Sequence, residues 1–151
     1  MDNTKNNSIE IISLKNKPGL ENEVFTVLSD AIYEATIEKA RMIILEFCTN
    51  NKNDLFGYFE SGNLVGIIGI EINEEIEIKY IGVEESNRNN GIGTKLINFI
   101  REVTKQNVLA ETDDDAINFY KRYGFTCEVL EKYYNGKKIR RYRCLMKSEK
   151  S

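Results

Sequence analysis

The spacing of apolar side chains in the first half of the chain predicts a strand, two helices and a meander. Residues 8–12 form a short β-rich segment, and residues 20–48 carry apolar side chains at helical spacing. A break near Ser29 and Asp30 divides the latter stretch into two helices. Three β-rich segments separated by polar turns follow, which predicts an antiparallel meander. These segments are residues 55–60, 64–72 and 76–83.

The second half of the chain alternates between helical and β-type patterns. After a polar loop with two glycines, five apolar residues share one face of a predicted helix. These residues are Ile92, Leu96, Ile97, Ile100 and Val103. A strand over residues 107–111 comes next. A short helix then runs from its cap at residues 113–115 to Tyr123, and Gly124 ends it.

The described pattern closes with a hairpin. Residues 125–130 and 138–146 are β-rich, and Asn135-Gly136 between them is a strong signal for a two-residue turn. The element order is β-α-α-β-β-β-α-β-α-β-β, which predicts an α+β fold with a single mixed, mostly antiparallel sheet flanked by helices. Because 151 residues is the usual length of one domain, we expect residues 1–151 to form a single domain.

Composition excludes several kinds of site. The chain has no histidine, which removes Ser-His-Asp and Cys-His catalysis and imidazole metal sites. Cys48, Cys127 and Cys144 are odd in number and form no C-x-x-C pair, so we expect free thiols in a reducing cytosol and no metal site. The polar N-terminus does not resemble a signal peptide, and no apolar run approaches ~18 residues. We therefore expect a cytoplasmic protein without a membrane partner.

Charge is distributed unevenly along the chain. The formal net charge is −3, which argues against a nucleic-acid partner. Residues 131–150 hold eight Lys or Arg and two Glu, so this end of the chain is basic. The first 130 residues are correspondingly acidic.

The loop before the third predicted helix has the features of an anion site. Backbone N–H groups at a helix N-terminus are unpaired and carry partial positive charge. Gly91 and Gly93 have no Cβ to hinder a phosphate, Arg88 supplies a cation, and Thr94 supplies a hydroxyl. The segment matches neither the dinucleotide fingerprint nor the Walker loop. Taken alone, it also fits a simple connection between strand and helix.

Three motifs in this order resemble the GNAT superfamily of N-acetyltransferases. They are the strand 76–83, the R-x-x-G-x-G loop that starts at Arg88, and the F-Y-x-x-x-G-F segment at residues 119–125. The resemblance covers about residues 55–146, and the predicted element order is also the family's order. It implies an enzyme that uses acetyl-CoA as cosubstrate and acetylates a primary amine by direct transfer in a ternary complex.

The resemblance also implies a cofactor site between strands 76–83 and 107–111, which splay apart in the family. The end of the first strand would pair with the pantetheine amides, and the loop would wrap the pyrophosphate. The implied residues are Ile81, Gly82, Val83, Arg88, Asn89, Asn90, Gly91, Ile92, Gly93 and Thr94. Asp113 stands where relatives often have an Asn that contacts the cofactor. An ionised Asp cannot donate a hydrogen bond, and Asp113 also fits a helix cap.

Three residues are expected to act on the reacting groups. The backbone N–H of Ile81 would polarise the thioester carbonyl. Tyr120 matches the tyrosine that relatives often place near the CoA sulfur, where its phenol could protonate the thiolate; the alternative is a packed aromatic helix face. Glu77 lies near the general base of histone-acetylating members, with a solvated strand edge or a water chain as the alternatives.

Three functions are weighed against one another. The first is an N-acetyltransferase for a cationic amine, because the first 130 residues are acidic. The second is a non-catalytic CoA-binding or sensor module on the same fold. The third is a nucleic-acid binder that uses the basic hairpin residues Lys137, Lys138, Arg140, Arg141 and Arg143, which also fit a solvated face. We favour the transferase, acting on a small-molecule or peptide amine without nucleic acid. The sequence itself does not specify an oligomeric state; the resemblance makes a homodimer possible, because dimers are common in the family.

Overall fold

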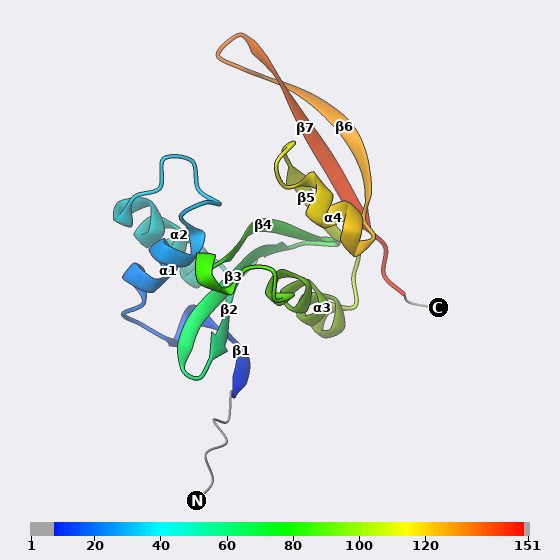
Figure 1. Cartoon of the computed structure of the whole chain (residues 1–151). Helices are drawn as coiled ribbons and strands as arrows, with labels where there is room; N and C mark the ends of the chain where they lie inside the picture. Colours follow the sequence, from blue (N-terminus) through cyan, green and yellow to red (C-terminus); the bar gives the residue numbers. More distant parts are fainter. Residues whose placement is uncertain (1–7, 150–151) are drawn as a thin grey trace, which may run out of the picture.

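The computed structural model describes residues 8–149, and its elements follow the predicted order (Figure 1). Their bounds are β1 (Ile9–Ser13), α1 (Glu21–Leu28), α2 (Ile37–Thr49), β2 (Asn53–Glu60), β3 (Asn63–Ile72), β4 (Ile76–Val83), α3 (Ile92–Thr104), β5 (Val108–Thr112), α4 (Ile117–Tyr123), β6 (Thr126–Tyr134) and β7 (Lys137–Met146). Two 3-10 turns, η1 (Leu14–Asn16) and η2 (Glu85–Asn87), lie in the connections. The predicted α+β class is therefore confirmed.

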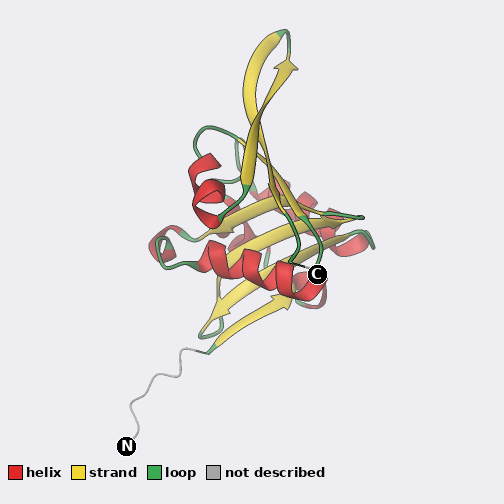
Figure 2. Ribbon diagram, turned by 90° about the vertical axis from the view of Figure 1, so that its right-hand side faces the viewer, coloured by secondary structure: helices red, strands yellow, loops and turns green. Residues whose placement is uncertain are grey.

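The strands form one mixed sheet with the order β1-β2-β3-β4-β5-β7-β6. Only β4 and β5 pair in parallel, and every other neighbouring pair is antiparallel. Helices α1 and α2 cover one face of this sheet, and α3 and α4 lie on the other (Figures 1 and 2). The sheet is thus mixed and mostly antiparallel, as its sequence pattern predicts.

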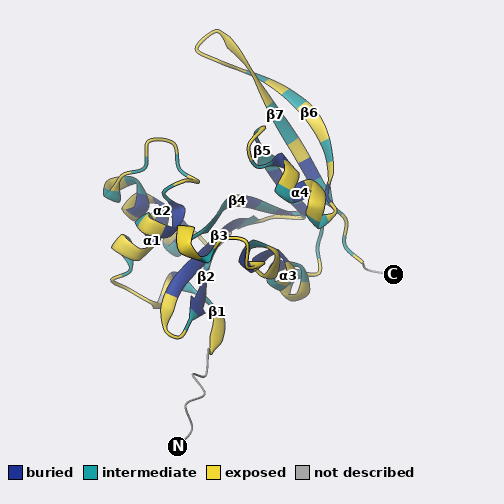
Figure 3. Ribbon diagram, viewed as in Figure 1, coloured by how far each residue is buried: buried dark blue, intermediate teal, exposed yellow. Residues whose placement is uncertain are grey.

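Each face of the sheet has its own hydrophobic core, and the central strands contribute to both (Figure 3). On one face Leu96 and Ile97 of α3 are fully buried against the strands. On the other, Leu28 of α1 and Phe47 of α2 pack around Ile67 of β3. Burying side chains of this size stabilises the fold by about 1.5–3 kcal/mol each, so the sheet is held rigidly from both sides.

Two predictions about the helices need correction. The break between α1 and α2 is longer than expected, because the side-chain hydroxyl of Thr36 accepts a hydrogen bond from the Lys39 N–H and starts α2 there. Ile32 therefore lies in the connection despite its helical spacing. Val103 is 60% exposed although it shares the apolar face of α3. It lies in the last turn, and periodicity specifies a face but not how far a neighbour covers it.

The β6–β7 hairpin is longer than predicted and projects away from the rest of the sheet (Figures 1 and 2). Asn135 and Gly136 both have a left-handed backbone, with φ of 50° and 78°, as a two-residue I′-type turn requires. The strands continue up to this turn. Glu131 and Lys132 interrupt the apolar pattern, so the pattern predicts strand only as far as Leu130.

The expectation of three free thiols is wrong for two of the cysteines. Cys127 and Cys144 lie directly opposite each other in the β6–β7 register and form a disulfide. Their Cα atoms are 4.1 Å apart, slightly closer than the ~4.4–6.8 Å that is usual for this bond. Only Cys48 is free among the described residues. The hairpin is therefore cross-linked near its base.

Within residues 8–149, no helix has the length and apolar character needed to cross a membrane. Among the same residues, no three His, Cys, Asp or Glu side chains lie together in a way that could hold a metal ion.

Candidate functional site

Strands β4 and β5 separate after a short stretch of pairing, which opens the sheet. Their parallel ladder covers only Ile76–Ile78 of β4 and Val108–Ala110 of β5, whereas β4 continues to Val83. A β-bulge accompanies the separation, because Gly69 of β3 pairs with Tyr80 and the next residue pairs with Ile78. Lys79 is thus an extra residue in β4. Bulges bend a strand and increase its twist, so this one favours the divergence of β4 from β5.

The last residues of β4 direct backbone groups into the gap. The Glu84 N–H donates to the Val65 carbonyl oxygen of β3 at 2.8 Å. In an antiparallel ladder, residues that face the partner strand alternate with residues that face away. Counting back from Glu84, Gly82 faces β3, whereas Val83 and Ile81 direct their N–H and C=O groups toward the gap beside β5. A ligand lying in the gap can therefore pair with β4 as a strand would.

A cavity of about 1410 Å³ occupies this gap and extends over the loop before α3. We call it the central cleft. It is lined by the end of β4, the loop from Asn87, the first turn of α3, the end of β5 and one side of α4. The predicted cofactor residues that line it are Ile81, Gly82, Val83, Arg88, Asn89, Gly91, Ile92, Gly93, Thr94 and Asp113. Asn90 and Glu77 are not among its lining residues.

The N-terminus of α3 faces the central cleft and has the character of an anion site. Gly91 is the N-cap in a left-handed conformation with φ of 74°, and Asn89 has φ of 67°. The first intrahelical bond in this turn runs from the Lys95 N–H to the Gly91 carbonyl at 3.0 Å. The N–H groups of the residues between them therefore have no partner within the helix. These unpaired donors and the helix dipole together favour a bound anion.

Glycine is favoured at positions 91 and 93 of the loop for different structural reasons. A Cβ at Gly91 would meet nothing within 4 Å, so the left-handed backbone alone favours glycine there. A Cβ at Gly93 would lie 3.0 Å from the ring of Phe119. The second glycine thus allows α4 to approach the start of α3 closely. The sequence interpretation, in which both glycines make room for a phosphate, missed this helix contact.

The side chain of Arg88 is held from two sides. Its Nη2 donates to Asp30 Oδ2 at 2.5 Å, and its Nε donates to the Val83 carbonyl oxygen at 3.0 Å. Asp30 belongs to the α1–α2 connection, 58 residues from Arg88. All three residues line the central cleft. Arg88, which the sequence predicts as a phosphate-binding cation, therefore lies in the cleft, and a carboxylate that sequence reasoning missed is its partner.

Tyr120 lies on the opposite wall, in α4. Only 4% of its surface is exposed, and its ring packs edge-on against Phe119 and Phe125 at centroid distances of 5.2 and 5.1 Å. Burial and the nearby charge of Asp113 raise the pKa of the Tyr120 hydroxyl well above its usual value. The phenol therefore keeps its proton at physiological pH. Both interpretations of Tyr120 have support, because the residue is part of a packed aromatic cluster and also lines the cleft.

Asp113 acts as a cap in this structure. Its Oδ1 accepts hydrogen bonds from the N–H groups of Asp115 and Ala116, both at 3.0 Å. These bonds fix the turn between β5 and α4, which places Tyr120. Since its side chain accepts bonds here, Asp113 does not present the donor that an Asn would supply.

Glu77 is placed on β4 before the bulge and forms an ion pair. Its carboxylate lies 3.0 Å from Lys79 Nζ, which also lies 3.9 Å from Glu71. Burial acts to lower the pKa of Lys79, but the hydrogen bond and charge of Glu77 outweigh it, so the net pKa is raised. Lys79 lines the cleft while Glu77 does not.

Sequence analysis missed a charged cluster at the end of β5. The Glu111 carboxylate accepts hydrogen bonds from Lys132 Nζ at 2.8 Å and from Arg141 Nε at 3.3 Å. Burial acts to raise the pKa of Glu111, but the hydrogen bonds and charges of Lys132 and Arg141 outweigh it and hold the pKa below its usual value. Glu111 and Arg141 line the cleft. The register of β5 with β7, which pairs Glu111 with Arg143, brings these side chains together.

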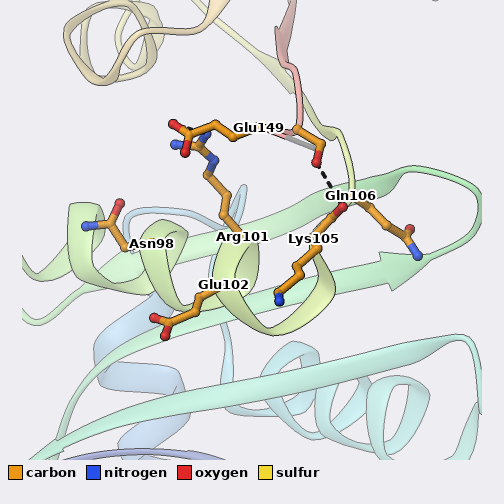
Figure 4. A pocket seen from close by; sticks show the side chains of 7 residues that line it. Asn98, Arg101, Glu102, Lys105, Gln106 and Glu149 are labelled. Carbon is orange, nitrogen blue, oxygen red and sulfur yellow. Dashed lines mark hydrogen bonds and ion pairs between the residues drawn. The ribbon is translucent and has the colours of Figure 1, made fainter. Parts of the chain in front are cut away.

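A second cavity, of about 510 Å³, lies between the end of α3 and the segment after β7 (Figure 4). Arg101 extends toward Glu149 across this cavity, and their charged groups are 3.6 Å apart. Lys105 and Glu102 also line it, so its charges are balanced. The balanced lining does not single out this cavity as a phosphate site.

Comparison with known proteins agrees with this geometry. Residues 22–125 match the model of the acetyltransferase (GNAT) family. The chain belongs to the GNAT acetyltransferase family. An uncharacterised N-acetyltransferase of Bacillus methanolicus is 27% identical to this GNAT chain over 105 residues, which cover 68% of the chain and 88% of the relative.

Solved structures show that the fold is that of the GNAT family. A GNAT acetyltransferase from Elizabethkingia anophelis with acetyl-CoA bound has a TM-score of 0.67 at 19% identity, covering 95% of this chain and 99% of its own. The aminoglycoside 6'-N-acetyltransferase from Enterococcus faecium has a TM-score of 0.72 at 20% identity, with coverage of 93% and 96%. At these identities the likeness concerns the fold.

Proposed function

We propose that the protein catalyses transfer of an acetyl group from acetyl-CoA to a primary amine by direct attack in a ternary complex. One observation carries this proposal: the end of β4 beyond its pairing with β5, the helix start with Arg88, and Tyr120 all line one cleft. The free thiol, Cys48, does not line it. Without a histidine and without a thiol in the cleft, the chain lacks the Cys and His groups of a thiol-based acetyl-enzyme, which favours direct transfer.

The residues of the central cleft fit acetyl-CoA in size and chemistry. The volume of about 1410 Å³ exceeds that of common small-molecule pockets, as a long cosubstrate requires. Val83 and Ile81 would pair with the pantetheine amides through their outward backbone groups. Arg88 and the first-turn N–H groups of α3 would hold the pyrophosphate. Asn89 and Thr94 line the same end of the cleft and add polar groups.

Bound acetyl-CoA supplies an activated thioester whose carbonyl carbon accepts the amine. The Ile81 N–H, which points into the gap, would donate to the thioester oxygen and stabilise the charge that develops there; such donors are worth about 3 kcal/mol of barrier. Tyr120 would donate its phenolic hydrogen to the leaving sulfur. Because its pKa is raised well above that of a thiol, the contribution of the phenol is a hydrogen bond that strengthens as the thiolate forms.

The amine must lose a proton before it attacks, so a base or a water chain has to reach it. We retain Glu77 as the proposed base. Its ion pair with Lys79 ties the carboxylate to a residue that lines the cleft. Glu111 lines the cleft directly, but two cations hold it, and a lowered pKa makes it a weaker base.

We propose a cationic acceptor, supported by the carboxylates of Asp30 and Glu111 in the cleft and by the acidic first 130 residues. The Enterococcus faecium relative is named for an aminoglycoside, a class of cationic amines. The cleft also holds the cations Lys79 and Arg141, so its charge is mixed rather than uniformly negative. The hairpin cations are partly neutralised, with Lys138 paired to Glu131 at 3.0 Å, which disfavours nucleic acid as the partner.

We further propose that residues 1–151 act as a single domain in the cytoplasm and that the active form is a homodimer. Shared burial of the central strands by helices on both faces supports the single domain.

Two measurements test the function. Calorimetric titration should show that CoA binds in the micromolar range and much more tightly than pantetheine, which lacks the phosphates. Acetyl-CoA should then release free thiol with a panel containing a polyamine, an aminoglycoside and a lysine peptide, and more slowly with an uncharged amine. Equal binding of pantetheine and CoA would refute the phosphate site. Tight binding without thiol release with any amine would instead support the alternative, a CoA sensor.

A further inference from the structure

The disulfide between Cys127 and Cys144 lies beside the central cleft, and the proposed reaction does not use it. Cys127 is in β6 and Cys144 is in β7. Because β7 also pairs with β5, Cys144 lies between Cys127 on one side and Ala110 on the other. The residues of β5 that follow Ala110 line the cleft. The cross-link is therefore next to the strand that forms one wall of the site.

The two cysteines of this disulfide differ in their access to solvent. Cys144 is fully buried, whereas Cys127 is partly exposed. A thiolate that opens a disulfide must reach one of its two sulfur atoms. An external thiol can therefore attack at Cys127, and Cys144 is then the leaving group.

The register of the hairpin holds the two cysteines opposite each other whether or not they are bonded. β6 pairs with β7 along its whole length without a register shift, and this ladder consists of backbone hydrogen bonds. These bonds do not require the cross-link. After reduction the two thiols would remain neighbours, so the disulfide can form again without a large rearrangement.

The disulfide is also close to the end of α4, which carries Tyr120. Helix α4 contacts β6 near the base of the hairpin (Figure 1). Gly124, Phe125 and Thr126 separate the helix from Cys127. The Phe125 N–H donates to the Tyr120 carbonyl oxygen at 3.0 Å, and the two rings pack together. Cys144 belongs to the same buried cluster as these rings. The cross-link thus anchors the segment against which Tyr120 is packed.

We propose that the Cys127–Cys144 pair is a reversible redox site that exchanges with small thiols and their disulfides, and that its closed form positions Tyr120 at the cleft. In the cytoplasm, the location proposed above, disulfides are mostly transient, catalytic or redox-sensing. The effect on Tyr120 rests on the proposed acetyl transfer, whereas the exchange itself does not.

Reduction takes place in two exchange steps. The thiolate of a small thiol attacks the Cys127 Sγ, the S–S bond breaks, and its electron pair leaves on the Cys144 Sγ, which takes up a proton. A second small thiolate then attacks the sulfur of the small thiol in this mixed disulfide and releases the Cys127 thiolate, which also takes up a proton. Two small thiols are oxidised to one disulfide, and the protein gains two thiols. Oxidation is the reverse, with the small disulfide as oxidant.

Counting thiols in the folded protein tests the exchange without any activity. The full chain is equilibrated in glutathione buffers that span the cytosolic range, quenched in acid, unfolded and alkylated. Mass spectrometry should find one alkylated cysteine, Cys48, in the oxidising buffers and all three cysteines alkylated in the reducing buffers. The same count in every buffer would overturn the proposal.

Single-thiol variants test the route of attack. In a Cys48→Ser background, Cys144→Ala leaves only Cys127, and Cys127→Ser leaves only Cys144. With oxidised glutathione, the folded variant that retains Cys127 should form a mixed disulfide at least about tenfold faster than the variant that retains Cys144, which is buried. Equal rates, or faster reaction at Cys144, would contradict the assigned route. Circular dichroism checks that both variants are folded.

Hydrogen exchange and kinetics test the link to α4. Opening the disulfide should lower the melting temperature by about 5–10 °C and speed exchange of the Phe125 amide, which donates to Tyr120. The Lys105 amide, bonded to Arg101 at the end of α3, is the control and should change little. Equal exchange of Phe125 in the two redox states would overturn the link.

The reduced enzyme and Cys127→Ser should both show kcat lowered roughly 3–10-fold with unchanged CoA affinity. Cys48→Ser is the matched control, because it removes a thiol but keeps the disulfide. Equal kcat in the oxidised and reduced enzyme would overturn the positioning of Tyr120. If no form of the protein acetylates an amine, the proposed function fails, and the thiol count and hydrogen exchange still decide the redox site.

Discussion

Arg88 and Asp30 form an ion pair across the central cleft, with the Arg88 Nη2 2.5 Å from Asp30 Oδ2. The same guanidinium is the cation we assign to the pyrophosphate of CoA. A phosphate group and the Asp30 carboxylate therefore compete for one cation. The connection between α1 and α2, which carries Asp30, is thereby linked to the cofactor end of the cleft.

Asp30→Asn should strengthen CoA binding. The pair is partly exposed, and such pairs are worth about 0–1 kcal/mol, so the dissociation constant should fall by up to about fivefold. Isothermal titration with CoA measures this effect. A weaker binding in Asp30→Asn would show that Asp30 orients Arg88 rather than competing for it.

Arg88→Ala should weaken CoA binding strongly. Hydrogen bonds to charged groups are worth about 1.5–3 kcal/mol, so we expect a loss of roughly 10–100-fold with an unchanged melting temperature. Arg41→Ala is the control, because Arg41 is an exposed arginine of α2 paired with Glu38 at 2.7 Å. Equal CoA affinity in the two variants would contradict the phosphate assignment.

Gly91→Ala and Gly93→Ala should each destabilise the protein, but for different reasons. Gly91→Ala forces a side chain into a left-handed backbone, which costs about 1–2 kcal/mol. Gly93→Ala places a methyl group against the Phe119 ring, and such overpacking costs about 1–3 kcal/mol. Adding Phe119→Leu should recover stability for Gly93→Ala but not for Gly91→Ala. Thermal unfolding of the four variants checks this, and a rescue of both glycines would contradict it.

Tyr120→Phe should slow the reaction without weakening CoA binding. It keeps the packed ring and removes the hydrogen that we assign to the leaving sulfur, so kcat should fall roughly 10²–10⁴-fold. Steady-state kinetics and calorimetry measure the two effects separately.

Tyr123→Phe is the matched control on the same helix. The Tyr123 hydroxyl donates to Asn98 Oδ1 at 2.5 Å and accepts from Arg101 at 3.2 Å, so its loss should lower the melting temperature and leave kcat nearly unchanged. If Tyr120→Phe behaved in the same way, Tyr120 would be a core residue only.

Glu111 should make the stability of the protein depend on acidic pH. Its pKa is lowered in the folded state, so its contribution is fully present above the pKa of the unfolded chain, about 4.3, and is lost as the pH falls through the folded pKa. The free energy of unfolding should therefore decrease from about pH 5 downward. Glu111→Gln should reduce this dependence in urea titrations at several pH values. The exposed Glu102→Gln serves as the control and should preserve it.

The order of the elements could be predicted because apolar spacing records which face of each segment is buried. The anion-binding loop could be predicted because Gly91, Gly93 and Arg88 are close in sequence. The pairing of Cys127 with Cys144 could also be predicted from the sequence. The two cysteines lie equally far from the Asn135-Gly136 turn, so the hairpin register places them opposite each other. We expected free thiols because cysteine number was considered without this register.

Other parts of the site depend on contacts that no local pattern records. Asp30 meets Arg88 from 58 residues away, and Lys132 meets Glu111 only because β7 lies between β5 and β6. The helix contact at Gly93 needs the position of Phe119. These relationships follow from how the elements pack, which spacing alone does not specify.

The extra residue at Lys79 changes which side chains of β4 face α3. Before it, Ile76 and Ile78 pack in the core beneath α3; after it, Ile81 and Val83 do. The inward and outward side chains of β4 therefore alternate in one phase before Lys79 and in the other phase after it. Deleting this one residue would leave a regular alternation, with Ile81 and Val83 still on the α3 side and the pairing with β3 unchanged, and would remove the bend that favours the separation of β4 from β5. The extra residue therefore sets how wide the sheet opens rather than which side chains line the opening.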